Sequence, residues 1–397
     1  MPGNPYSGSE PNEVLERFMR YVRLDTASDP DNPSRPSSRG QVDFADLLED
    51  ELAAMKGPWE CRRLSDGSLL VRIGASKGKE GALHSAFLAH LDTYYGLPGA
   101  ANPRIVEDHA GKRLVVTDGN SLLGADDKSG VAALMTVLSA LARDDLPHGP
   151  VDFWFTTDEE IGRIGVEALP SGVGESWKVL WTLDGEDLRE ISVGDLAIRR
   201  AEVAFTGVDA HPCLHGQDLV PAHYAAARFM DRLAEFPNPM TSSGRAPFFQ
   251  VASIQGRAER AEVFCRMASF DGGDLPEMEK RLGELAETAA ASYGARVEIR
   301  YSTGSANFNE AVAARPQLIE PARRALAARG FPARESEIRG GTDGGLLAVS
   351  FPGLAAPDLG TGARNPHSRG EYLVIDELLA LPGIVMDIIA VYSMSIV

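Results

Sequence analysis

The chain has only three cysteines among its 397 residues: Cys61, Cys213 and Cys265. Their number is odd, their spacing is wide and no C-x-x-C occurs, so we expect neither a disulfide framework nor a cysteine zinc site. Long hydrophobic runs are also missing, which argues against a membrane span. The first 25 residues carry charged side chains and no apolar signal-peptide core, so we expect a cytoplasmic protein.

Positive charge is scarce as well. The chain has 39 Lys and Arg residues against 57 Asp and Glu residues, which gives a formal net charge of −18. Nucleic acids and anionic membranes bind clustered Lys and Arg, so this balance argues against both as partners. The hydrophobic fraction of 44% is that of an ordinary globular protein.

Strands alternate with helices in the first half of the chain. Apolar runs typical of buried strands cover residues 68–73, 83–89, 151–157 and 178–183, and apolar residues at helical spacing cover 128–142. This alternation predicts an α/β domain with helices on both faces of its sheet.

A different pattern begins near residue 195. It reads as strand 197–205, helix 222–236, strands 248–254 and 261–270, helix 275–291 and strand 297–301. This βαββαβ order is typical of an α+β ferredoxin-like unit. We therefore expect residues 196–305 to form an inserted second domain, and residues 1–195 and 306–397 to form the α/β domain.

Acidic and histidine side chains follow the predicted strands. They occur in His90-Leu91-Asp92, Asp126-Asp127, Asp158-Glu159-Glu160, Asp184-Gly185-Glu186 and a late loop that contains His367. In open α/β sheets ligands bind at the carboxyl ends of strands, so these segments can converge. Each motif alone is also explained by a polar loop or a helix N-cap. Together, two imidazoles and several carboxylates suit one or two ions of zinc, manganese or cobalt.

The spacing within the motifs suggests a division of roles. In H-x-D, the imidazole of His90 can bind a metal while Asp92 accepts its other ring N–H. One of the two adjacent aspartates could bridge two cations. Adjacent glutamate side chains diverge, so one of Glu159 and Glu160 can bind metal while the other acts as a base.

The order of these motifs resembles the peptidase T, carboxypeptidase G and acetylornithine deacetylase superfamily of metal-dependent hydrolases, and within it most resembles peptidase T. The likeness covers nearly the whole chain, including T-D-G-x-S-L-L-G-A-D-D-K-S-G from Thr117 and I-R-G-G-T-D-G-G from Ile338. It implies a zinc-peptidase-like catalytic domain with a mixed sheet. It also implies that the inserted domain is a lid through which a homodimer forms.

The resemblance implies two ligand sets that share one carboxylate: His90, Asp126 and Asp184 for one ion, and Asp126, Glu160 and His367 for the other. Asp92 would orient His90, and Glu159 would be the general base. A cis peptide bond is implied between Asp126 and Asp127.

The resemblance also implies residues that bind substrate. Arg339 would grip a substrate carboxylate, Asn307 lies near a hinge, and His211 would reach a neighbouring active site in a dimer. The family usually has an arginine where this chain has Ala268. Arg266, two residues earlier on the same strand face, could substitute for it.

A second departure from the family pattern is Cys213, which stands where the family usually has the glycine of H-P-G. Both departures fall in the inserted domain, in the part that is expected to recognise the substrate.

We expect a metal-dependent hydrolase of C–N bonds, an aminopeptidase on short peptides that carry a carboxylate. An aminohydrolase or amidohydrolase acting on a small non-peptide carboxylate, such as an N-acyl amino acid or a nitroanthranilate, stays open because of the departures. A non-catalytic small-molecule binding protein is the alternative from another class. Loss of Glu159 or of a metal ligand would favour it, and none is lost.

Overall fold

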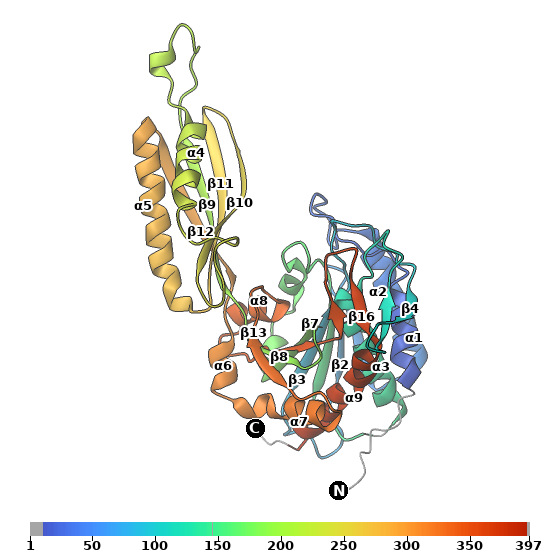
Figure 1. The fold of residues 1–397 in the computed structure, drawn as a ribbon. Helices are drawn as coiled ribbons and strands as arrows, with labels where there is room; N and C mark the ends of the chain where they lie inside the picture. The colour runs from blue at the N-terminus through green and yellow to red at the C-terminus, as the bar shows by residue number, and fades with distance from the viewer. Residues whose placement is uncertain (1–10, 145, 395–397) are drawn as a thin grey trace. The chain divides into compact units, whose positions relative to one another are not determined.

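The computed structural model describes residues 11–144 and 146–394. The chain divides into two compact units (Figure 1). The first unit consists of Met1–Gly194, Phe308–Glu337 and Thr342–Val397, and the second unit of Asp195–Asn307 and Ile338–Gly341. The helices of the described residues include none that is long and apolar enough to cross a membrane.

The first unit contains an eight-stranded sheet in the order β1-β2-β6-β3-β7-β14-β8-β13. Its strands are β1 (Trp59–Arg63), β2 (Leu69–Ile73), β3 (Ser85–His90), β6 (Val151–Thr156), β7 (Val179–Gly185), β8 (Glu190–Gly194), β13 (Arg334–Glu337) and β14 (Asp358–Gly360). Strands β6, β3, β7 and β14 pair in parallel, whereas β2 pairs antiparallel with β6 and β8 with β14. The sheet is therefore mixed, as expected.

Helices cover both faces of this sheet. Helix α3 (Ala125–Arg143) contacts β3 and β7, whereas Leu88, Trp154 and Leu180 pack with Leu347 of α8 (Asp343–Ser350). Every residue of β3 and β6 is buried, which explains their continuous apolar runs. The other helices of this unit are α1 (Pro11–Tyr21), α2 (Arg39–Met55), α6 (Asn309–Ala313), α7 (Glu320–Ala328) and α9 (Ile375–Tyr392). The predicted α/β fold is confirmed.

A small antiparallel sheet also belongs to the first unit, with the order β15-β16-β5-β4. Its strands are β4 (Arg104–Glu107), β5 (Arg113–Val116), β15 (Ala363–Arg364) and β16 (Tyr372–Val374). The sequence did not predict these strands because they are at most four residues long. The loop between β15 and β16 carries His367.

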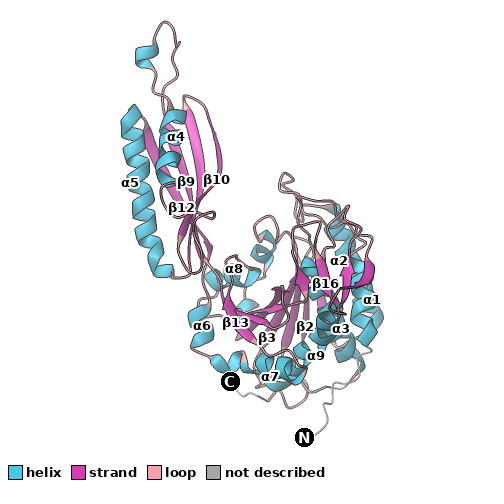
Figure 2. Ribbon diagram, in the orientation of Figure 1, coloured by secondary structure: helices cyan, strands magenta, loops and turns pink. Residues whose placement is uncertain are grey.

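The second unit is a four-stranded antiparallel sheet packed against two helices (Figure 2). Its elements are β9 (Ala197–Thr206), α4 (Ala222–Leu233), β10 (Phe248–Gly256), β11 (Arg260–Ser269), α5 (Leu275–Tyr293) and β12 (Arg296–Ser305). Val203, Phe205, Val263 and Met267 from alternate strand positions join Phe229 of α4 in one apolar core. The element order is the predicted βαββαβ, and the other face of the sheet has no helix from this unit.

Candidate metal centre

Five of the sequence-predicted residues meet at the carboxyl ends of the parallel strands. His90 ends β3, Glu160 follows β6 and Asp184 is the residue before the last of β7. Asp126 stands at the start of α3, and His367 reaches the same place from the loop between β15 and β16. The chain reversals that follow parallel strands bring these segments to one edge, although up to 277 positions separate them in the sequence (90 to 367).

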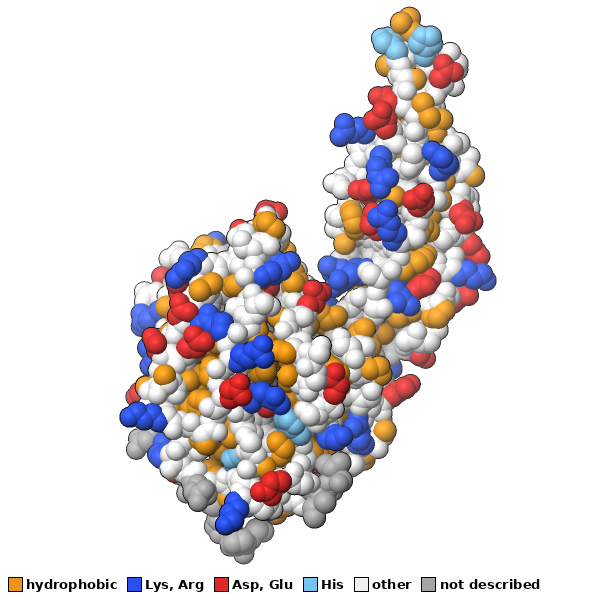
Figure 3. Space-filling model, turned by 180° about the vertical axis from the view of Figure 1, so that it is seen from behind, with side chains coloured by type: hydrophobic (Ala, Val, Ile, Leu, Met, Phe, Trp, Pro, Cys, Tyr) orange, Lys and Arg blue, Asp and Glu red, His pale blue; other side chains and the backbone are white. Residues whose placement is uncertain are grey.

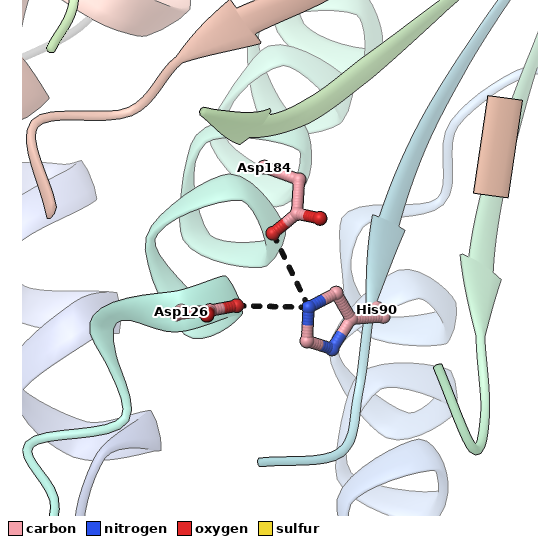
Figure 4. A group of neighbouring side chains, drawn as sticks. All are labelled: His90, Asp126 and Asp184. Atoms are coloured by element: carbon pink, nitrogen blue, oxygen red, sulfur yellow. Dashed lines mark hydrogen bonds and ion pairs between the residues drawn. The ribbon is translucent and has the colours of Figure 1, made fainter. Parts of the chain in front are cut away.

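The first group consists of His90, Asp126 and Asp184, shown in Figure 4. Nε2 of His90 lies 3.0 Å from Oδ1 of Asp126 and 3.3 Å from Oδ1 of Asp184. The imidazole is fully enclosed, with 1% of its side chain exposed, while each carboxylate keeps 16% exposed. The three candidate ligand side chains thus point at one another from three different elements.

The second group consists of Asp126, Glu160 and His367. Nε2 of His367 lies 3.0 Å from Oε1 of Glu160 and 3.2 Å from Oδ2 of Asp126. Asp126 therefore turns one oxygen toward each imidazole. In each group the ligand atoms lie within 4.8 Å of one another.

The donor sets fit divalent metal ions. Each group offers one imidazole nitrogen and two carboxylates, ligands that zinc, manganese and cobalt accept. Two ions that share a bridging carboxylate are a common arrangement in hydrolases. The Asp126–Asp127 peptide bond is cis, where the resemblance places one.

Each titratable side chain of the cluster has a shifted pKa. Hydrogen bonds that His367 donates to the carboxylates of Asp126 and Glu160 raise its pKa to about 11. Burial raises the pKa of Glu160 and of Asp184 to about 7, and the charge of Asp126 adds to both shifts. The two imidazoles, in turn, outweigh burial and lower the pKa of Asp126. The neighbouring carboxylates thus favour the protonated form of His367.

Metal affinity is expected to fall as the pH is lowered. A bound ion must displace the proton of His367 and any proton on Glu160 or Asp184. Each displaced proton weakens metal binding by about tenfold for every pH unit by which the pH is lowered. Zinc or manganese titrations at pH 6 and pH 8 should differ by at least about 100-fold in dissociation constant. Equal constants at the two pH values would contradict the assignment of His367.

Buried carboxylates hold the backbone around the cluster. Oδ1 and Oδ2 of Asp92 accept the backbone N–H groups of Glu159 and Glu160, each at 3.0 Å. The same carboxylate lies 3.4 Å from Nδ1 of His90, whose nearer contact is the backbone carbonyl of Asp92 at 3.1 Å. Asp92 thus links the H-x-D motif to the two glutamates, besides facing the imidazole.

Asp127 and Asp358 likewise accept the backbone N–H groups of two candidate ligands. The backbone N–H of His90 donates to Asp127 at 3.1 Å, and that of Asp184 donates to Asp358 at 3.0 Å. Both carboxylates are buried. No sequence motif assigned a role to either residue. Asp127 could have been noticed as the second half of the Asp-Asp pair, whereas Asp358 has no local signal.

Glu371 fixes the backbone at Asp126, the ligand that the two groups share. Its carboxylate accepts the backbone N–H groups of Gly124 at 2.8 Å and Asp126 at 3.0 Å. It is buried, and burial raises its pKa to about 7. Its position four residues after His367 was the only sequence signal for it.

Replacing Glu371 by Gln is expected to weaken metal binding by about 10- to 100-fold, as loss of an outer partner of a metal ligand usually does. The amide keeps the side-chain shape, but one of its two ends is a donor and cannot accept a backbone N–H. Metal titration measures the effect. Asp376→Asn is a matched control, because its side chain is 62% exposed. Wild-type affinity in Glu371→Gln would show that the two backbone contacts do not position Asp126.

Tyr94 packs against the most exposed candidate ligand. Its ring stacks on His367 with centroids 4.5 Å apart and planes 9° from parallel. His367 keeps 45% of its side chain exposed and has a positive φ of 59°. The stack restricts the orientation of an imidazole that the surrounding loop leaves open. No sequence motif indicated this role for Tyr94.

The four predicted substrate-binding residues belong to the second unit. Arg339 donates to the carbonyl of Gly244 and, at 3.1 Å, to the hydroxyl of Ser242, and its guanidinium lies 5.1 Å from the ring centroid of Phe248. Arg266 lies exposed on β11.

His211 and Asn307 differ in their surroundings. His211 lies in an exposed loop after β9, where its Nδ1 accepts the backbone N–H of Leu214 at 3.2 Å. Asn307 donates to the carbonyl of Phe270 at 2.8 Å and accepts the backbone N–H of Asp195 at 3.3 Å. Asn307 therefore ties together the two ends of the second unit.

Comparison with known proteins identifies the protein family in which this geometry occurs. Residues 86–390 match the peptidase family M20/M25/M40. The chain belongs to this peptidase family. It is accordingly a metal-dependent hydrolase, as the sequence predicted.

Relatives in this peptidase family extend over nearly the full length of the chain. Peptidase T of Shewanella sediminis is 32% identical over 406 residues, covering 94% of this chain and 97% of the relative. Peptidase T of Geobacillus thermodenitrificans is 30% identical over 410 residues, covering 96% and 98%. The predicted resemblance to peptidase T is confirmed.

Solved structures show the same fold. The aminopeptidase PepT of Bacillus cereus has a TM-score of 0.75 at 21% identity, covering 97% of this chain and 99% of that one. A tripeptidase of Staphylococcus aureus has a TM-score of 0.76 at 20% identity with the same coverage. A Bacillus subtilis peptidase described as dinuclear and metal-binding has a TM-score of 0.66 at 16% identity, covering 96% and 98%.

Proposed function

We propose that this M20 family member is an aminopeptidase that hydrolyses short peptides, with two divalent ions held by the groups that share Asp126. The observation that carries the proposal is the two-sided Asp126 carboxylate, which faces His90 with one oxygen and His367 with the other. Zinc, manganese and cobalt all suit these donors. Such ions would lower the pKa of a water molecule toward 7 and polarise the scissile carbonyl.

Glu159 is the general base in this proposal. Its backbone is fixed by Asp92, and burial raises the pKa of its carboxyl well above the usual range, with the charges of Asp343 and Asp184 adding to the shift. A base with a raised pKa holds a proton more readily at neutral pH. Glu159 takes a proton from the attacking water and returns it to the leaving nitrogen. Glu160, 5% exposed and hydrogen-bonded to His367, is left to bind metal.

The second unit supplies the substrate contacts in this proposal. Arg339 binds a substrate carboxylate through its guanidinium, and Arg266 stands in for the family arginine missing at Ala268. His211, in its exposed loop, serves the neighbouring active site of a homodimer, and Asn307 lies at a hinge. Assembly through the second unit and a cytoplasmic location stay predictions of the sequence.

A tripeptide panel tests the proposed function. The purified chain, stripped of metal and reloaded with zinc or manganese, should release the N-terminal residue of tripeptides, and lose this activity again with a chelator. Blocking the amino terminus by acetylation should abolish cleavage. If the metal-loaded protein leaves every tripeptide intact but hydrolyses N-acyl amino acids or a nitroanthranilate, the aminohydrolase alternative is correct instead.

A further inference from the structure

Asp158 stands directly before the proposed base Glu159, and no step of the proposed reaction uses its carboxylate. On the face of the molecule drawn in Figure 3, acidic side chains are scattered over the surface among Lys and Arg side chains. Asp158, in contrast, has none of its surface exposed. Burial of a carboxylate is unfavourable unless hydrogen bonds replace the lost water, so the partners of Asp158 show what its burial achieves.

Gln41 and Ser37 supply these hydrogen bonds, from 117 and 121 positions earlier in the chain. Nε2 of Gln41 donates to Oδ1 of Asp158 at 2.7 Å, and Oε1 of Gln41 accepts the backbone N–H of Asp158 at 3.0 Å. The backbone N–H and the hydroxyl of Ser37 donate to the same carboxylate. Both partner residues are buried. The amide of Gln41 thus binds the side chain and the backbone of Asp158 at once.

The backbone N–H groups of residues 158–160 are each bound by a buried side-chain oxygen. Gln41 accepts that of Asp158, and Asp92 accepts those of Glu159 and Glu160, all three at 3.0 Å. Asp158 also has a positive φ of 53°, in the left-handed region that residues other than glycine seldom adopt. Such a conformation persists only where its surroundings hold it. The direction in which the chain leaves Asp158 and presents Glu159 therefore depends on the contact with Gln41.

We propose that Gln41 is a positioning residue for Glu159 and acts on it through Asp158, an inference that rests on the general base of the proposed function. Gln41 has no exposed surface, so it does not touch the substrate itself. A general base must lie within hydrogen-bond reach of the proton that it takes. Displacement of a catalytic group by about 1 Å can lower the rate by about 100-fold, so a fixed backbone at Asp158 has a direct catalytic effect.

Hydrogen exchange tests the positioning without any substrate. Gln41→Met keeps the length of the side chain and removes both hydrogen bonds to Asp158. The backbone N–H of Asp158 should then exchange at least about tenfold faster than in wild type, while those of helix α9 keep their wild-type rates and show that the variant is folded. Gln317→Met is the matched control, because Gln317 is exposed in the same unit. Unchanged exchange at Asp158 in Gln41→Met overturns the proposal.

Kinetics of the metal-loaded protein test the link to Glu159. On a tripeptide, Gln41→Met should lower kcat by about 10- to 100-fold, with KM and metal content close to the wild-type values. In the Glu159→Gln background the same change should have no further effect on kcat, because a residue that acts through the base cannot act without it. A general structural defect would lower kcat by the same factor in both backgrounds, and that result contradicts the proposal.

A rescue experiment tests the pairing of Gln41 with Asp158. In Asp158→Asn, the side chain at position 158 keeps one acceptor oxygen for the donors of both Ser37 and Gln41, so kcat should fall about 10- to 100-fold. Adding Gln41→Glu provides a carboxylate that accepts the new amide as well as the backbone N–H. Asp158→Asn/Gln41→Glu should therefore recover most of the lost kcat. A double variant no more active than Asp158→Asn would show that the two side chains do not act as a pair.

The two kinds of measurement distinguish failure of this proposal from failure of the proposed function. If the wild type hydrolyses N-acyl amino acids or a nitroanthranilate instead of tripeptides, the same kinetic comparisons are made on that substrate. If it hydrolyses none of these compounds, while the backbone N–H of Asp158 exchanges faster in Gln41→Met, the proposed function fails and the positioning of residues 158–160 by Gln41 stands.

Discussion

Glu159→Gln is expected to lower kcat by about 10²- to 10⁴-fold, the usual contribution of a positioned general base. The amide keeps the size of the side chain but cannot take a proton from water. Because Glu160 rather than Glu159 contacts His367, metal content and KM should stay close to the wild-type values. Steady-state kinetics on a tripeptide, together with metal analysis of the same sample, measure both quantities.

The matched control for this change is Glu167→Gln, a glutamate on the exposed surface of the same unit. It should retain full activity. A metal-loaded Glu159→Gln enzyme that kept more than about a tenth of wild-type kcat would mean that another group carries the proton. Glu160 and Asp343 would then be the next candidates, because both charges act on Glu159.

Asp126→Asn is expected to remove both metal ions at once. The side chain belongs to both ligand groups, so its loss as a charged ligand leaves each group with one imidazole and one carboxylate. Affinity should fall by more than about 100-fold, because even an outer partner is worth about 10- to 100-fold. Activity should be lost along with the metal.

Thermal unfolding gives an independent measure of the same change. A metal present at about a thousandfold excess over its dissociation constant stabilises a protein by about 4 kcal/mol, so zinc should raise the melting temperature of wild type but not of Asp126→Asn. Asp376→Asn should respond to zinc like wild type. If the Asp126→Asn protein retained one tightly bound ion per chain, Asp126 would belong to a single site and the shared-ligand proposal would be wrong.

These effects depend on how the cluster is built. The candidate ligands come from five separate segments, and four of the five have backbone N–H groups held by buried carboxylates: Asp92, Asp127, Asp358 and Glu371. Only His367 is positioned differently, by its stack on Tyr94. A protein that fixes its ligands in this way needs little rearrangement when metal binds, and preorganised groups of this kind make the largest contributions to catalysis.

The sequence by itself determined the elements and the candidates for chemistry. Local periodicity is enough to define a buried strand or an amphipathic helix, and polar residues directly after such strands must lie at the edge of the sheet where ligands bind. His90, Asp184 and the pair Glu159 and Glu160 were singled out in this way. The resemblance to a known family added the partition into two groups around Asp126.

Only the tertiary structure decided the long-range pairings. The insertion of β6 between β2 and β3, the short strands β15 and β16, the carboxylate of Asp358 beside Asp184 and the register that sets Arg200 opposite Arg266 have no local signal. The physical reason is that strand order, register and contacts between distant segments depend on the packing of the whole chain, whereas periodicity and turn chemistry depend on neighbours in sequence.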